Sequence, residues 1–175
     1  MNKTDTKTTT GEVMRAMDLS ELQGHIRSLI TLDEEDAPIV SAYVPIGEIG
    51  AGSNPMATRV REIRKLLTEA ERTSFDEPFD RILQYLAREL RPSTRGVAAF
   101  ARGGERPFFL GLQFQVPVPD RLSVSSSPDV YHLVELKDTY HRYVVLIANE
   151  ESARILEVHL GAVTRCPPTG WMMAS

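Results

Sequence analysis

The sequence predicts an α+β protein in which helices pack on a mixed or antiparallel sheet. Apolar residues recur at helical spacing in three parts of the chain, near residues 19–32, 54–91 and 129–141. Short runs rich in β-branched and aromatic residues lie between these parts and predict strands. The connections between the middle strands are short, which favours antiparallel or mixed pairing over a parallel sheet.

The composition is that of an ordinary globular protein. The 175 residues are 42% hydrophobic and 25% charged, with a formal net charge of −4. This charge gives no overall attraction to nucleic acid or an anionic membrane, although a local basic patch could still bind RNA. One cysteine, Cys166, excludes an intrachain disulfide and fits a reducing compartment. We expect a cytoplasmic protein with a disordered tail at 1–17, and neither a membrane nor DNA as partner.

The first ordered elements are a helix and a strand. Asp18 and Glu21 stand three residues apart, which is the pattern of a capping box, and the apolar residues that follow predict a helix over 19–32. The four carboxylates at 33–36 are interpreted as a solvated turn, because adjacent carboxylates do not converge on one metal ion. The run 38–45 predicts a core strand that Pro45 ends.

A helical hairpin is predicted next. Its first helix begins at 54–55, and its second follows a connection at 73–78. The expected inward residues are Val60, Ile63, Leu66, Leu67 and Ala70, then Phe79, Ile82, Leu83, Leu86 and Leu90. Basic residues point outward among carboxylates. Either this is a solvated surface of mixed charge, or some of these cations contact RNA phosphates. The candidate contacts are Arg59, Arg61, Arg64, Lys65, Arg72, Arg81 and Arg88.

Strands follow the hairpin. The predicted strands are 95–101, 107–116 and 121–125, and a tight turn at 102–105 joins the first two. In the second of them Phe108, Leu110, Leu112, Phe114 and Val116 alternate with Phe109, Gly111, Gln113 and Gln115. A helix is then expected over 129–141, with Val130, Leu133, Val134 and Tyr140 on one face.

The segment 142–161 predicts another hairpin. Residues 143–148 are apolar without alternation, so we expect both faces of this strand to be buried. Residues 149–152 have turn chemistry, and 153–160 favour a second strand in which neither face is purely apolar. A buried hairpin needs partners, so we expect it to open a second domain.

The residues that could carry chemistry are scattered. His25, His132, His141 and His159 lack metal-ligand spacing and are interpreted as structural or surface residues. Cys166 has no evident base, and neither Ser41 nor Ser123 lies in a nucleophile elbow. Asp129 and Asp138 stand near helix ends, where capping is the default role. We expect no metal, no cofactor and no catalytic residue in this chain.

The order and spacing of these segments are similar to those of a known protein family. The run 39–45, the basic helical hairpin, and then 96–100, 128–133 and 143–155 together resemble the bacterial branch of the archaeo-eukaryotic peptide-chain release factor superfamily, which is related to class I release factors and pelota. The resemblance implies three domains: an N-terminal α+β domain that faces the decoding centre, a central RNase H-like domain with a Gly-Gly-Gln loop, and a C-terminal domain related to a ribosomal protein. It places the N-terminal domain at 18–140 and the start of an incomplete central domain at 141–175.

The chain departs from that family in two places. The connection expected at 73–78 lacks the Asn-Ile-Lys-Ser motif with which the family reads stop codons, and no Gly-Gly-Gln follows the last hairpin. The resemblance therefore implies a ribosome-associated protein of the termination or rescue type that does not hydrolyse peptidyl-tRNA, with the ribosome or its RNA as partner. The alternatives are a protein-interaction or stress-response module, and an enzyme whose pocket joins His132 to Glu135 or Asp138. The oligomeric state stays open.

Overall fold

A computed structural model of the chain describes residues 17–33, 37–47, 55–150 and 152–165. The tail predicted at 1–17 lies outside this part except for Met17, as does the acidic run at 34–36. The described helices are α1 (Leu19–Ile30), α2 (Pro55–Leu66), α3 (Glu69–Arg88) and α4 (Tyr131–Thr139). The strands are β1 (Ile39–Pro45), β2 (Gly96–Arg102), β3 (Phe108–Phe114), β4 (Arg121–Ser125), β5 (Tyr143–Ala148), β6 (Ala153–His159) and β7 (Ala162–Arg165). The predicted α+β class is confirmed.

The larger sheet, sheet A, has the strand order β3-β2-β1-β4, and every neighbouring pair is antiparallel. Ala42 of β1 pairs with Ala99 of β2 on one side and with Leu122 of β4 on the other. Strand β2 is buried along its whole length, and β1 is buried up to Val44. Such central strands are covered on both faces, and this explains why their sequences are apolar apart from Ser41 and the terminal Arg102.

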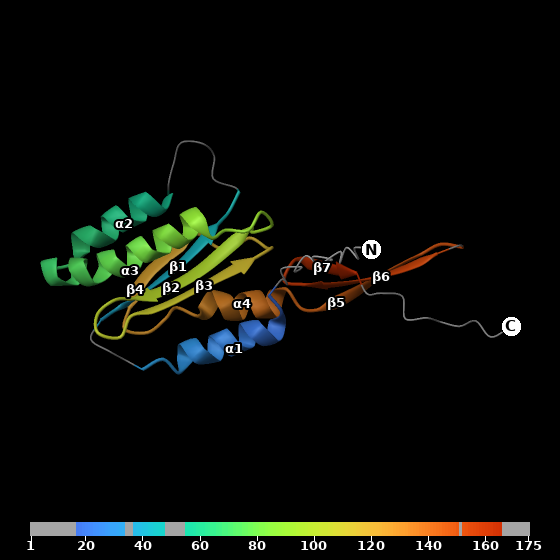
Figure 1. The fold of residues 1–175 in the computed structure, drawn as a ribbon, viewed down its shortest axis with the longest axis horizontal. Coiled ribbons are helices and arrows are strands. Elements are labelled where there is room, and N and C mark those ends of the chain that lie inside the picture. Colours follow the sequence, from blue (N-terminus) through green and yellow to red (C-terminus); the bar gives the residue numbers. More distant parts are fainter. Residues whose placement is uncertain (1–16, 34–36, 48–54, 151, 166–175) are drawn as a thin grey trace, which may run out of the picture.

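Helices cover both faces of sheet A (Figure 1). On one face, α1 and α4 form a core with Tyr43, Phe100 and Leu112. On the other face, α2 and α3 form a second core with Ala42 and Ala99. The alternation predicted for β3 is confirmed, because Phe108 and Leu110 pack into the first core and Phe109 packs into the second. Sheet A is therefore the middle layer of three.

The capping box of α1 is present. The Asp18 carboxylate accepts from the backbone N–H of Glu21 at 2.8 Å, and the Glu21 carboxylate accepts from the backbone N–H of Asp18 at 3.0 Å. The helix ends at Ile30, two residues before the predicted end, and Ile30 is exposed. Leu22, Ile26 and Leu29 are the side chains that α1 buries.

The predicted connection of the helical hairpin is wrong. Residues 73–78 lie inside α3, and α2 and α3 are joined at Leu67 and Thr68. Pro78 therefore stands within a helix, where it costs roughly 3 kcal/mol. Phe75 and Phe79 stack on the buried face at 5.4 Å, and full burial of one such side chain contributes roughly 1.5–3 kcal/mol. Burial of the two rings offsets the proline, a tertiary effect that local propensity does not reveal.

Three expected core residues in the helices are instead exposed. Leu66 and Leu83 lie on the outer surface of α2 and α3, and Val134 of α4 is also exposed. Tyr85, which helical spacing did not select, is buried against sheet A. The buried face of α3 runs through Phe75, Phe79, Ile82 and Tyr85. The side chain of Ala70 lies outside the described residues.

The second sheet, sheet B, has the order β5-β6-β7 with antiparallel pairs throughout. The turn between β5 and β6 has the predicted Asn chemistry: the Asn149 side chain accepts from the backbone N–H of Ser152 at 2.6 Å. The prediction that β5 is buried on both faces is wrong, because five of its six residues are exposed. An unbroken apolar run indicates a strand that could be buried, but burial also needs covering elements.

Sheet B packs against the core of sheet A through the turn between β6 and β7. Leu160 is buried in the core with α1 and α4, and it has a positive φ of 45°. Gly161 follows with φ 76°, and a Cβ there would lie 2.6 Å from a Val116 side-chain atom. This position therefore requires glycine.

Among the described residues, no helix combines the length and the apolar character needed to cross a bilayer.

Candidate functional site

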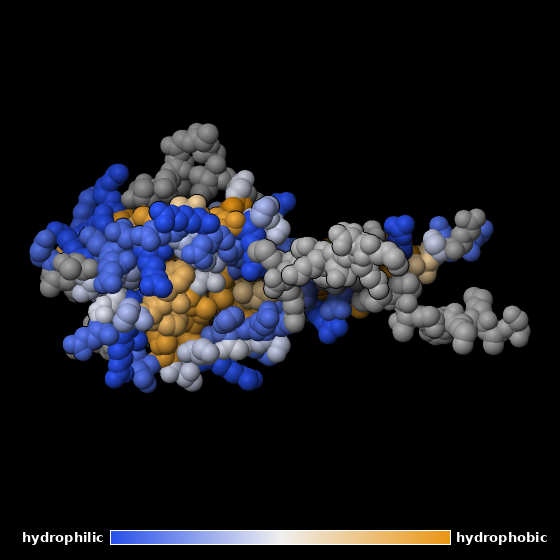
Figure 2. All heavy atoms as spheres, in the orientation of Figure 1, coloured by the Kyte–Doolittle hydropathy of each residue, from blue (hydrophilic) through white to orange (hydrophobic). Residues whose placement is uncertain are grey.

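The seven predicted phosphate contacts all lie on α2 and α3 by backbone position. The side chain of Arg59 lies outside the described residues. Arg61, Lys65, Arg81 and Arg88 are exposed, whereas Arg64 and Arg72 are half-buried. Figure 2 shows largely hydrophilic side chains over these two helices. The helical hairpin therefore presents most of these cations to solvent.

Several of these cations are held by neighbouring carboxylates. Arg64 bridges the two helices through Asp76, with a nitrogen–oxygen distance of 2.6 Å, and Arg72 donates to the Arg64 carbonyl at 3.0 Å. Lys65 pairs with Glu62 at 2.8 Å, and its hydrogen bond and charge lower the pKa of that carboxyl. Exposed pairs of this kind contribute about 0–1 kcal/mol. The contacts of Arg64 and Arg72 join α2 to α3, whereas the Lys65 pair lies within α2.

The charge of the hairpin is uneven. Helix α2 carries four basic residues and one carboxylate, Glu62, which is a formal charge of +3. Helix α3 carries three arginines and five carboxylates, which is a formal charge of −2. Arg81 of α3 is further committed, because its guanidinium lies 5.1 Å from the centre of the Phe109 ring. The basic surface is therefore α2 and not the whole hairpin.

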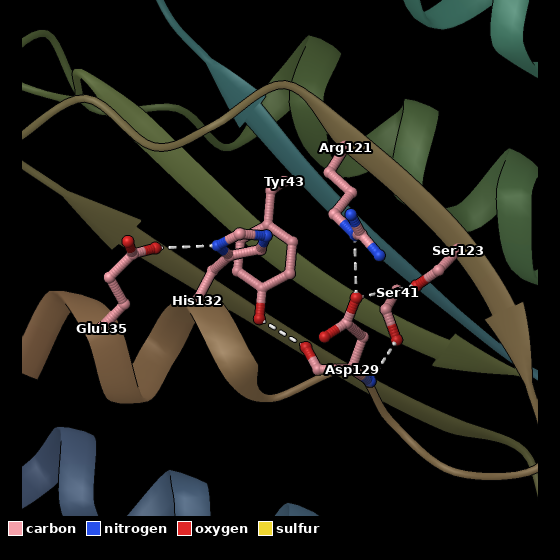
Figure 3. Close-up of polar contacts among 7 residues, drawn as sticks. All are labelled: Ser41, Tyr43, Arg121, Ser123, Asp129, His132 and Glu135. Atoms are coloured by element: carbon pink, nitrogen blue, oxygen red, sulfur yellow. Dashed lines mark hydrogen bonds and ion pairs between the residues drawn. The ribbon is translucent and has the colours of Figure 1, made fainter.

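A second group of polar residues lies on the other face of sheet A, where α4 begins (Figure 3). Ser41 and Tyr43 are two residues apart on β1, so their side chains share one face. The Tyr43 hydroxyl donates to the Asp129 carbonyl at 2.5 Å, and the Asp129 N–H donates to the Ser41 hydroxyl at 3.0 Å. Two side chains of the central strand thus hold both backbone groups of Asp129.

The side chain of Asp129 is held from β4. Its carboxylate accepts from the Arg121 guanidinium at 3.1 Å and from the Ser123 hydroxyl at 3.4 Å. The expected capping role of Asp129 is wrong, because the N-cap of α4 is Val130 and no side chain caps this helix. The carboxylate turns to β4 because a cation and a hydroxyl are available there.

His132 joins the same group. Its ring lies edge-on to Tyr43 at 5.1 Å, and its Nδ1 is 2.9 Å from the Glu135 carboxylate. The contact with Glu135 that an enzymatic role would need is therefore present, but it is a local i,i+3 pair on α4. Tyr43 is fully buried, and burial raises its pKa well above the ordinary value, so its hydroxyl remains a donor even at a pH where an exposed tyrosine ionises.

These contacts form a clamp, which we define as Ser41, Tyr43, Arg121, Ser123, Asp129 and His132. Each polar group of Asp129 already has a partner within the protein. The clamp joins β1, β4 and the start of α4, and so it positions α4 on sheet A. In the sequence, Ser41, Ser123 and Asp129 could be weighed only one at a time, because no spacing signal relates residues 41–43 to 121–132.

A groove of about 250 Å³ follows the outer edge of β3, between α1 and α3. Its lining includes Glu21, His25, Tyr85, Arg91 and Gln113. The Gln113 amide donates to the Tyr85 hydroxyl and the Glu89 carbonyl, and its oxygen accepts from Thr94. This amide therefore ties β3 to the end of α3. Within the part of the chain that the structure describes, no three His, Cys, Asp or Glu residues could hold a metal ion together.

Comparison with known proteins adds no assignment. No family model matches the chain, and no curated protein matches it.

Proposed function

We propose that this protein binds ribosomal RNA through α2, as a cytoplasmic, release-factor-like protein of the termination or rescue type. The observation that carries the proposal is the concentration of positive charge on one exposed helix of a chain whose net charge is −4. A phosphate backbone can bind Arg61, Arg64 and Lys65 at the same time. The surface ion pairs of Arg64 and Lys65 are weak, so these cations can exchange their carboxylate partners for phosphates. Arg81 and Arg88 belong to the acidic helix and are outside the core of this proposed contact.

Binding without hydrolysis is part of the proposal. The clamp has hydroxyl, carboxylate and imidazole groups, but its hydroxyls and its carboxylate are engaged in holding α4. The connection between α2 and α3, Leu67-Thr68, is flanked by Leu66 and Glu69 and does not contain Asn-Ile-Lys-Ser. We therefore propose contact with the ribosome that is independent of the stop-codon sequence.

The test is cosedimentation with 70S ribosomes over a series of salt concentrations. Arg61→Glu should weaken the association at low salt, and it should lower the slope of log affinity against log salt by about one for each phosphate that the variant no longer neutralises. The matched control is Arg27→Glu, an equal charge change at an exposed position of α1, on the opposite face of sheet A. No association at low salt would refute the proposal, and so would an equal effect of the two variants.

A second candidate function is a protein-binding module. The observation in its favour is sheet B, where Tyr143, Leu146 and Val163 are each at least 58% exposed. A pull-down that recovers proteins without ribosomal RNA, and that Leu146→Glu abolishes while Arg61→Glu does not, would favour this candidate over the first.

A further inference from the structure

The pairing of sheet B sorts its side chains into two faces. Residues directly opposite each other across antiparallel strands point to the same side. Tyr143 of β5 lies opposite Val158 of β6, which in turn lies opposite Val163 of β7. Val145 lies opposite Leu156. With Ile147, these residues form one side, which we call the apolar face; Arg154, opposite Ile147, and Arg165, opposite Leu156, lie on the same side. The other side is mixed, because it carries Val144, Leu146 and the ion pair between Arg142 and Glu157.

Strand β5 is also an edge strand. Among the strands that the structure describes, it pairs with β6 on one side only, so its other side presents main-chain N–H and C=O groups that no described strand meets. Its six residues include no charge and no proline, the usual features that prevent edge strands from pairing. Val144, Leu146 and Ile147 are each more than half exposed. The edge is thus an open template for a further strand of similar chemistry.

We propose that the strand that completes this edge is β5 of a second copy of the chain, antiparallel to the first, with the two-fold axis beside Val145. Two-fold symmetry through an antiparallel pair requires an axis perpendicular to the sheet. Such an axis leaves the apolar face of each copy on the same side. Each residue must then lie opposite a residue of the second copy that points to the same side of the sheet. The two-fold axis must therefore pass beside a single residue of β5 and not between two residues.

A two-fold axis beside Val145 pairs β5 along its whole length with β5 of the second copy. Tyr143 then lies opposite Ile147 of the second copy, and Val144 lies opposite Leu146 of the second copy. Both pairs join apolar side chains of one face, as stable cross-strand pairs do. Arg142 lies opposite Ala148 of the second copy, so that no like charges meet. A parallel in-register pairing would instead set the two Arg142 side chains side by side, which disfavours it.

The pairing also suits the size of the sheet. Three short strands with little covering are marginal in isolation, whereas six strands lie within the usual range for a sheet. The pairing extends the apolar face across both copies and brings the Tyr143 and Ile147 side chains of the two copies into contact. This inference is independent of the proposed RNA contact, since α2 packs on sheet A and the proposed pairing uses sheet B.

Cysteine cross-linking tests the register directly. With Cys166 replaced by serine, Val145→Cys should give a disulfide-linked dimer under mild oxidation, because the two Val145 positions face each other at a separation that a disulfide can span. Leu146→Cys in the same background is the matched control, and it should not cross-link because its counterpart is displaced along the strand. Cross-linking of Leu146→Cys without Val145→Cys would overturn the proposed register.

Sedimentation velocity tests the interface. The sedimentation coefficient of the full chain should rise with concentration, and Val145→Lys should remove this rise by placing two cations together. Val163→Lys adds the same charge to the apolar face, but at β7, away from the β5 edge. It should leave self-association unchanged, and circular dichroism should show that both variants are folded. A monomer at all concentrations, or an equal decrease with both variants, would overturn the proposal.

Discussion

The Tyr43 hydroxyl gives the sharpest stability prediction. Tyr43→Phe keeps the ring contacts with Phe100 and His132 and removes only the donor to the Asp129 carbonyl. Tyr43 is fully buried, so the carbonyl loses its partner where replacement by water is difficult. We expect a loss of about 1–2 kcal/mol in the free energy of unfolding at pH 7. The midpoint of thermal unfolding should fall by about 2–8 °C.

The same substitution predicts a pH dependence. Burial raises the pKa of Tyr43 in the folded protein, whereas the unfolded chain has the ordinary tyrosine pKa of about 10. The stabilisation is therefore complete below about pH 10 and is lost as the pH rises above it, because only the unfolded state ionises. At pH 11 the unfolded state of the unmodified chain gains about 1.4 kcal/mol, and the phenylalanine variant gains nothing at this position.

Urea unfolding followed by circular dichroism measures both effects. The unmodified chain should exceed the variant in stability at pH 7, and the difference should shrink towards zero by pH 11. All other ionisable groups are shared, so they cancel in the comparison. A difference below about 0.5 kcal/mol at pH 7, or one that stays constant up to pH 11, would refute the hydrogen bond as the source of this stability.

Three further substitutions test the packing of sheet A and its helices. Asp18→Ala removes the capping box of α1 and should cost about 1 kcal/mol in urea unfolding. Gly111→Val should cost about 1–3 kcal/mol in thermal unfolding, since a Cβ there lies 2.5 Å from the Tyr85 ring, and Tyr85→Ala should cost less in the Gly111→Val background than in the unmodified chain. Gln113→Leu leaves the polar groups of its neighbours unpaired and should cost about 1–3 kcal/mol; an unchanged unfolding midpoint would count against a structural role for this amide.

Much of the fold follows from local sequence signals. The capping box at Asp18, the alternation through β3 and the turn at Asn149 all depend on residues within a few positions of one another. The error at 73–78 has the opposite origin. Pro78 and Ser74 indicate a helix boundary locally, but the burial of Phe75 and Phe79 against sheet A decides that the helix continues.

The basic residues show the same division. Sequence alone located Arg61, Arg64 and Lys65 on an outward helix face, because helical spacing fixes which side chains point away from apolar neighbours. It did not reveal that Arg64 meets Asp76 of the next helix or that Arg81 lies over Phe109. Those partners depend on how α2 and α3 lie together and on which strand lies beneath them.

By itself, then, the sequence determined the class of the fold, most of the strands and the direction in which the cations point, since these depend on short-range periodicity. The tertiary structure alone assembled the clamp around Asp129, because its members come from β1, β4 and the start of α4 and share no spacing. It also decided the state of β5. An apolar run can predict a strand, but only its neighbours determine whether that strand is buried or left as an open edge.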